Sequence, residues 1–131
     1  MIRFIICFLV IFIPLYALSA SQQEKDKTIR EITDAMRSGD AGSLSKYMNS
    51  MLDLSIPSYD DTYSSQQASR ILADFFSKNP VQSFTVLKQT VTGDTLTQLI
   101  GELKSKAKTY QVYILIRKSG DQYRINQIKI N

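Results

Sequence analysis

The chain lacks histidine entirely and has a single cysteine among its 131 residues. Without histidine, no Ser-His-Asp or Cys-His catalytic arrangement can form. Cys7 lies in an N-terminal apolar run, so the rest of the chain has neither of the usual zinc ligands and no disulfide. There is also no Gly-rich phosphate loop and no dinucleotide fingerprint. The sequence therefore predicts no metal and no cofactor, and it excludes the commonest hydrolytic and nucleotide-dependent chemistries.

The first twenty residues have the layout of a secretory signal peptide. Arg3 supplies the positive start, Phe4–Leu15 is an almost unbroken apolar run, and small residues favour cleavage after Ser19 or Ala20. The run is shorter than the roughly 20 residues of a membrane-spanning helix. We predict removal of residues 1–20 and export to the periplasm or the cell exterior, without membrane attachment after cleavage; a retained N-terminal anchor is the alternative.

Residues 21–131 are expected to form one domain, because their length suits a single hydrophobic core. The formal charge of the whole chain is only +4. A nucleic-acid partner is not expected, since such proteins usually concentrate more positive charge on one face. Lys104, Lys106 and Lys108 gather at one turn, where they are expected to be solvated and to discourage edge-to-edge strand pairing. A contact with an anionic surface is the alternative.

Apolar residues at helical spacing predict three helices, over Ser21–Ser38, Ala41–Met48 and Ser65–Lys78. Gly39 suits the end of the first helix, and Asp40 can cap the second. The third helix follows a capping box, Ser64-x-x-Gln67. Its apolar stripe is broad enough to cover a sheet and consists of Ala68, Ile71, Leu72, Phe75 and Phe76.

Alternating apolar residues predict strands on both sides of the third helix. A short strand, Met51–Ile56, ends at Pro57 and is followed by a polar loop over Ser58–Tyr63. The remainder predicts a meander of four strands over Ser83–Thr92, Thr95–Lys104, Thr109–Lys118 and Tyr123–Ile130. Gly93-Asp94 is expected to form a two-residue type II′ hairpin loop. Gly101 lies inside a strand, where glycine marks a bend or a close backbone approach.

The last strand changes phase along its length. Tyr123 and Ile125 share one phase, whereas Ile128 and Ile130 share the other, so a regular strand would divide them between two faces. One extra residue at about Asn126-Gln127 returns all four to the same face. We therefore predict a β-bulge there, which bends and twists the sheet.

Helices followed by an antiparallel sheet indicate an α+β fold. The segment Met36-x-x-Gly39-Asp40-x-x-Ser43-Leu44-x-x-Tyr47, the Ala68…Phe75-Phe76 helix and the closing Tyr123–Ile130 strand resemble the nuclear transport factor 2-like superfamily. That resemblance implies a cone of helices over a curved antiparallel meander sheet, the cystatin-like fold. Together with the signal peptide, the chain most resembles a secreted bacterial family named domain of unknown function 4783. The superfamily contains isomerases, dehydratases, cyclases and non-catalytic binding or dimerising members, so the resemblance alone implies no single function.

The leading hypothesis is an exported, non-catalytic module that binds a small apolar ligand or a protein partner. A pocket between helices and sheet would be lined by Tyr47, Phe76 and Tyr110. A second surface follows from Thr109–Lys118, which is apolar on both faces. Tyr113 and Leu115, with Leu99 and Leu103, are expected to form a homodimer surface there.

The alternative hypothesis is an acid–base enzyme of the ketosteroid isomerase type that acts on a small apolar carbonyl compound. Asp53 would be its catalytic base, provided that the carboxyl group lies in a cavity that tunes its pKa. The other interpretation gives Asp53 no catalytic role: it faces solvent on an edge strand. Asp60 and Asp61 lack the ligand spacing of a calcium loop and are expected in a solvated turn.

Overall fold

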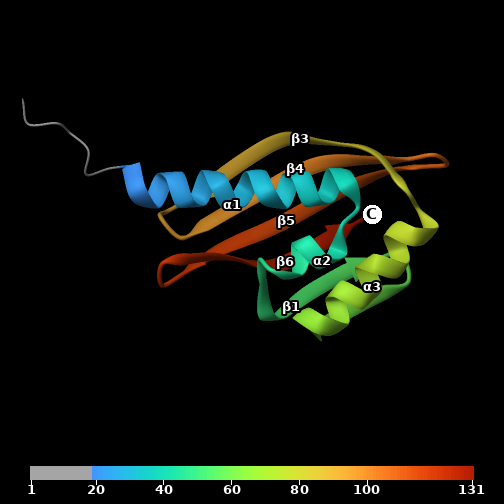
Figure 1. Ribbon diagram of the computed structural model, residues 1–131, viewed down its shortest axis with the longest axis horizontal. Coiled ribbons are helices and arrows are strands. Elements are labelled where there is room, and N and C mark those ends of the chain that lie inside the picture. Colours follow the sequence, from blue (N-terminus) through green and yellow to red (C-terminus); the bar gives the residue numbers. More distant parts are fainter. Residues whose placement is uncertain (1–18) are drawn as a thin grey trace, which may run out of the picture.

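The computed structural model describes residues 19–131, which form three helices and six strands. Figure 1 shows all three helices on the same side of the sheet. The part of residues 1–20 that precedes Ser19 lies outside the described residues, while Ser19 and Ala20 form the start of the first helix. The elements are α1 (Ser19–Ser38), α2 (Ala41–Ser45), β1 (Met48–Ile56), β2 (Tyr59–Ser64), α3 (Ser65–Lys78), β3 (Val81–Thr92), β4 (Leu96–Ser105), β5 (Thr109–Ser119) and β6 (Gln122–Ile130).

The six strands form one sheet in the order β2-β1-β6-β5-β4-β3. Strands β3 to β6 are the predicted antiparallel meander. The β1–β2 hairpin is added beside β6, and β1 runs parallel to β6 as the one parallel pair of this sheet. The α+β class and the curved, mainly antiparallel sheet under a helical layer are confirmed.

The predicted bulge in β6 is present at Asn126. Leu115 pairs with Gln127, and the next residue of β5, Ile116, pairs with Ile125, so Asn126 is the extra residue. The phase change therefore leaves all four apolar side chains of β6 on the core face. Each of them is at most 7% exposed: Tyr123, Ile125, Ile128 and Ile130.

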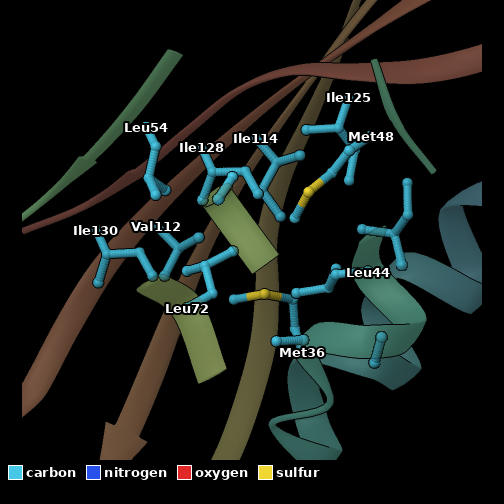
Figure 2. Packing of buried hydrophobic residues seen from close by; sticks show 14 of the residues in the cluster. Met36, Leu44, Met48, Leu54, Leu72, Val112, Ile114, Ile125, Ile128 and Ile130 are labelled. Carbon is cyan, nitrogen blue, oxygen red and sulfur yellow. The ribbon is translucent and has the colours of Figure 1, made fainter. Parts of the chain in front are cut away.

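The core lies between the helices and the inner face of the sheet. Figure 2 shows Met36 of α1, Leu44 of α2 and Leu72 of α3 packed towards side chains from β1, β5 and β6. Helix α3 has the predicted capping box, in which the Ser64 hydroxyl accepts from the Gln67 amide at 3.2 Å. Its apolar stripe buries four residues: Ala68, Leu72, Phe75 and Phe76.

The second helix ends three residues earlier than predicted, at Ser45 rather than Met48. Tyr47 has already joined the sheet, because its carbonyl accepts a 2.7 Å hydrogen bond from the Ile125 amide. Met48 pairs with Ile125 and is 4% exposed, so it begins β1. The predicted strand Met51–Ile56 is thus the second half of a longer strand.

The polar loop predicted over Ser58–Tyr63 is wrong, because this segment forms strand β2. Its backbone pairs with β1 along its whole length: Tyr59 pairs with Ile56 next to the turn, and Ser64 pairs with Met51 at the other end. An edge strand that is largely exposed needs no alternation of apolar side chains, so the periodicity that marks buried strands is missing.

The β3–β4 hairpin loop also differs from its prediction. Thr92 pairs with Leu96, so the loop has three residues, Gly93, Asp94 and Thr95, instead of two. Gly93 has the positive φ, 61°, that glycine accommodates best. The β5–β6 loop is the two-residue one, since Ser119 pairs with Gln122.

Gly101 marks the predicted close approach of two backbones. A Cβ atom at this position would lie 2.7 Å from the Phe84 ring and 2.9 Å from the Thr85 carbonyl oxygen. Strand β3 bulges next to this point, since Val86 pairs with Gly101 and Lys88 with Ile100. Glycine thus lets the Phe84 ring lie directly on β4.

We expect Gly101→Ala to lower the free energy of unfolding by about 1–3 kcal/mol, because the added methyl group must displace backbone as well as the Phe84 ring. Urea unfolding followed by circular dichroism measures the change. Gly42→Ala is the matched control, since the same methyl group there meets only the Asp40 side chain, at 3.3 Å. An unchanged midpoint for Gly101→Ala would contradict the close approach.

Candidate functional site

Two of the three predicted pocket residues are part of the core. Phe76 and Tyr110 are each 6% exposed. The Tyr110 ring packs edge-on against Phe75 at 5.3 Å between centroids, and its hydroxyl donates to Asn79 Oδ1 at 3.0 Å. Aromatic rings therefore fill the space between α3 and the sheet where a ligand pocket was expected.

The third predicted pocket residue, Tyr47, lines a surface groove, which we call the Tyr47 groove. It consists of two hollows that share Lys46 and Tyr47. One, of about 360 Å³, lies between α1 and α2. The other, of about 160 Å³, lies between α1 and the β5–β6 hairpin, at the end of the sheet beside the start of α1 in Figure 1. The second hollow is lined by Glu24, Thr28, Lys46, Tyr47, Gln122, Tyr123 and Arg124.

The two walls of the Tyr47 groove carry opposite charges. Helix α1 contributes carboxylates, including Glu24 and Glu31. The opposite wall contributes Lys46 and Arg124. The Arg124 guanidinium donates through Nη1 to the Lys46 carbonyl at 2.6 Å, so it fixes the α2–β1 linker to β6. This arrangement suits a small polar ligand better than an apolar one.

Asp40 fixes the α2 end of the groove. Its carboxylate accepts from the Ser43 hydroxyl at 2.6 Å and from the Ser43 amide at 3.0 Å. These hydrogen bonds lower the pKa of the Asp40 carboxyl below its ordinary value of 3.8, so the cap stays ionised to a lower pH than an ordinary aspartate does. The helix is short, and this cap positions Ser43 on the groove wall.

The outer face of the sheet is the side opposite the helices, and it contains the predicted dimer residues Tyr113 and Leu115. Both are half-buried. The prediction that Leu99 and Leu103 belong to this face is wrong, because they are 1% and 0% exposed in the core. Ile100 has the outward phase instead and pairs directly with Tyr113.

A polar signal in β4 identifies the outward phase. Gln98 and Glu102 alternate with the buried residues of this strand, and Ile100 lies between them in the same phase. Polar side chains are expected on the side of an antiparallel sheet that faces water. The outward phase of Gln98 and Glu102 therefore indicates that Leu99 and Leu103 point into the core, which the leucines alone do not indicate.

Asp53 lies on the outer face and is exposed. Its carboxylate accepts a 2.7 Å hydrogen bond from the Thr62 hydroxyl of the neighbouring strand. All twelve Asp and Glu residues fall within the described part of the chain, and none of them is buried. The enclosed carboxylate that acid–base catalysis requires is therefore not present there, and no cluster of metal-ligating side chains occurs among the described residues.

Residues 29–131 match the family described as Domain of unknown function (DUF4783). The chain belongs to this family. A crystal structure of a DUF4783 family protein from Bacteroides ovatus is 30% identical and superposes with a TM-score of 0.72, covering 76% of this chain and 90% of that one. The family resemblance inferred from the sequence is confirmed.

More distant structures show that the DUF4783 chain has the expected fold. An NTF-2 like protein of unknown function from Silicibacter pomeroyi has a TM-score of 0.59 at 12% identity, covering 86% of this chain and 96% of that one. A domain of unknown function with a cystatin-like fold from Nostoc punctiforme has a TM-score of 0.66 at 9% identity, covering 86% and 77%. No curated protein matches the chain. Within the described residues of this DUF4783 protein, no helix is both long and apolar enough to span a membrane.

Proposed function

We propose that this DUF4783 protein is an exported, non-catalytic binding module that pairs with a second copy through the outer face of its sheet. The observation that carries the proposal is the apolar strip formed by Ile100, Tyr113 and Leu115, which alternate with the buried residues of β4 and β5 and so lie on the face opposite the helices. Apolar strips on an otherwise polar face mark interaction surfaces. A two-fold dimer uses the same surface on both copies and needs no other partner.

The size of the outer face suits a dimer. Six strands spaced about 4.8 Å apart give a width of about 24 Å. Strands of nine residues, such as β6, give a length of roughly 30 Å. The product is on the order of 700 Å², close to the roughly 800 Å² that each partner buries in a stable complex.

The charges of the outer face also suit a second copy. One row of paired residues runs across the sheet from Lys88 through Tyr113 and Lys129 to Asp60. Asp53 of β1 adds a further carboxylate beside β2, the strand that contains Asp60. A face with charges of both signs can match an identical face, whereas a face of one sign would repel it.

The absence of catalysis is proposed from the shape of the site. The grooves beside α1 are open, the candidate base Asp53 is exposed, and Phe76 and Tyr110 occupy the core. No observation favours the acid–base enzyme over a binding module. Binding then takes place on accessible surfaces, and the Tyr47 groove and the outer face are the two candidates described above.

We expect Leu115→Glu to convert a dimer of residues 21–131 into a monomer, because it places a carboxylate within the apolar strip, beside Tyr113. Sedimentation velocity at micromolar concentration measures the effect. Val91→Glu is the matched control: Val91 is 50% exposed, and it pairs with the buried Thr97, so it has the phase of the helix side of the sheet and not of the outer face. A parent protein that sediments as a monomer rejects the dimer, and so does equal dissociation of both variants.

Export is tested separately with the full-length chain in a Gram-negative host. Mass spectrometry of the periplasmic fraction or medium should find a chain that begins at Ala20 or Ser21. Leu9→Arg interrupts the apolar run and should retain the uncleaved protein in the cell. Uncleaved parent protein in the membrane fraction would instead support the N-terminal anchor.

A further inference from the structure

We infer that the Tyr47 groove binds an elongated zwitterion, a molecule with an ammonium group at one end and a carboxylate at the other. The groove follows α1 from Glu24 to Ser38, roughly 20 Å at about 1.5 Å per residue, so its two hollows lie one after the other along the helix. This site gives the binding function proposed above a class of ligand. It rests on that binding function but does not require the dimer.

The two hollows differ in the charges that line them. The charged lining residues of the larger hollow, of about 360 Å³, are Glu31, Asp34 and Lys46. Those of the smaller hollow, of about 160 Å³, are Glu24, Lys46 and Arg124. Carboxylates are in excess in the larger hollow, and cations are in excess in the smaller one. A zwitterion matches this pattern when its ammonium lies in the larger hollow and its carboxylate in the smaller one.

Most of these charges have no ionic partner within the part of the chain that the structure describes. Of the five charged lining residues, Asp34 alone forms an ion pair there, with Arg37 at 3.4 Å. Glu31 is half-buried and has no such pair. Partial burial removes water from a carboxylate, and an ammonium group bound in the hollow compensates for that loss.

Hydrogen bonds within the protein leave the larger hollow rich in acceptors. The Ser43 hydroxyl donates to the Asp40 carboxylate at 2.6 Å, and the Ser38 hydroxyl donates to the Asp34 carbonyl at 3.0 Å. Each hydroxyl proton is therefore used, and each serine has oxygen lone pairs left for a ligand. An ammonium group has three donors and no acceptor, so it suits these oxygens together with the carboxylates.

The smaller hollow is rich in donors. The Arg124 guanidinium donates to the Lys46 carbonyl and to the Gln122 side chain, and these two hydrogen bonds hold it in place. A guanidinium has five N–H donors, so about three have no partner among residues 22–131. The Lys46 ammonium adds further donors to the same hollow. A carboxylate accepts charge-assisted hydrogen bonds from both groups.

Tyr47 lies where the two hollows meet, since it lines both of them. Its carbonyl accepts from the Ile125 amide at 2.7 Å, so its backbone is fixed to the sheet, and its half-buried side chain offers aromatic surface to the middle of a ligand. Three residues of extended peptide span about 10 Å. The groove is therefore long enough for a tripeptide or for an aliphatic amino acid of similar length.

Titration with triglycine tests the site, because its two ends carry the required charges. N-acetyl-triglycine lacks the ammonium and triglycine amide lacks the carboxylate, so each is a matched ligand with one charge. Two-dimensional ¹H–¹⁵N NMR of the purified protein, at constant ionic strength, should show saturable shifts of the amides of Ser43, Tyr47 and Arg124. Triglycine should bind about tenfold or more tightly than either analogue, because it alone forms charge-assisted hydrogen bonds at both ends.

A second zwitterion, 6-aminohexanoate, distinguishes the two sources of such a ligand, because it has the same end groups on an aliphatic chain. Tighter binding of triglycine indicates a peptide, and tighter binding of 6-aminohexanoate indicates an aliphatic amino acid. The analogues of 6-aminohexanoate with one charge are hexanoate and hexylammonium. The proposal is overturned if neither zwitterion causes saturable shifts of these amides, or if loss of one charge leaves the affinity of the tighter ligand unchanged.

Glu31→Gln tests the ammonium end separately. It should weaken the binding of triglycine about tenfold or more and leave that of N-acetyl-triglycine unchanged, because the analogue has no ammonium to lose a partner. Lys46→Gln should weaken the binding of both, because both have the carboxylate. Glu102→Gln is the matched control: Glu102 is also half-buried but lies on the outer face, and its loss should change the affinity less than about twofold. Equal weakening of triglycine binding by Glu31→Gln and Glu102→Gln would show nonspecific attraction and reject the site.

The groove and the dimer are tested independently, because they use opposite sides of the sheet. A protein that sediments as a monomer and still binds the zwitterion with these shifts rejects the dimer and supports the groove. A dimer that binds neither zwitterion rejects the groove and leaves the outer face as the binding surface.

Discussion

The extra residue at Asn126 is the constraint on which the rest of the molecule depends. It lets Ile125 and Ile128 face the same core although the spacing between them is odd. Its side chain also holds the neighbouring strand, since Asn126 Oδ1 accepts from Asn49 Nδ2 at 3.1 Å. The parallel β1–β6 register shifts at the same place, between Met48 and Asp53. The bulge thus completes the core and places the β1–β2 hairpin, on which α3 packs.

Side chains fill the interior between the helices and the sheet, so binding is expected at the surface. The proposed export would place the protein in oxidising conditions, yet the chain has no cysteine after position 7, so the domain is stabilised by packing and not by disulfides. The buried rings of Phe76 and Tyr110 belong to that packing. The accessible surfaces include the Tyr47 groove with its charged walls and an outer face with an apolar strip. Both suit binding, and neither encloses a reactive group.

The sequence predicts elements best where a single pattern is strong. The apolar stripe of α3, the phase change in β6 and the glycine inside β4 at position 101 were each sufficient to predict the structural feature that is observed there. β2 was missed because an exposed edge strand has no apolar alternation. Phe76 and Tyr110 were misplaced because an aromatic residue has the same pattern whether it fills a core or lines a pocket.

Deletion of Asn126 tests the central claim most directly. Without it, Ile128 and Ile130 turn outward, and each loses a burial energy of roughly 1.5–3 kcal/mol, a large part of the stability of a small domain. Deletion of Asp94, in an exposed loop, is the matched control. Urea unfolding should show a large loss of stability, or no cooperative transition, for the Asn126 deletion and a small change for the Asp94 deletion. A parent-like midpoint after deletion of Asn126 would contradict this account.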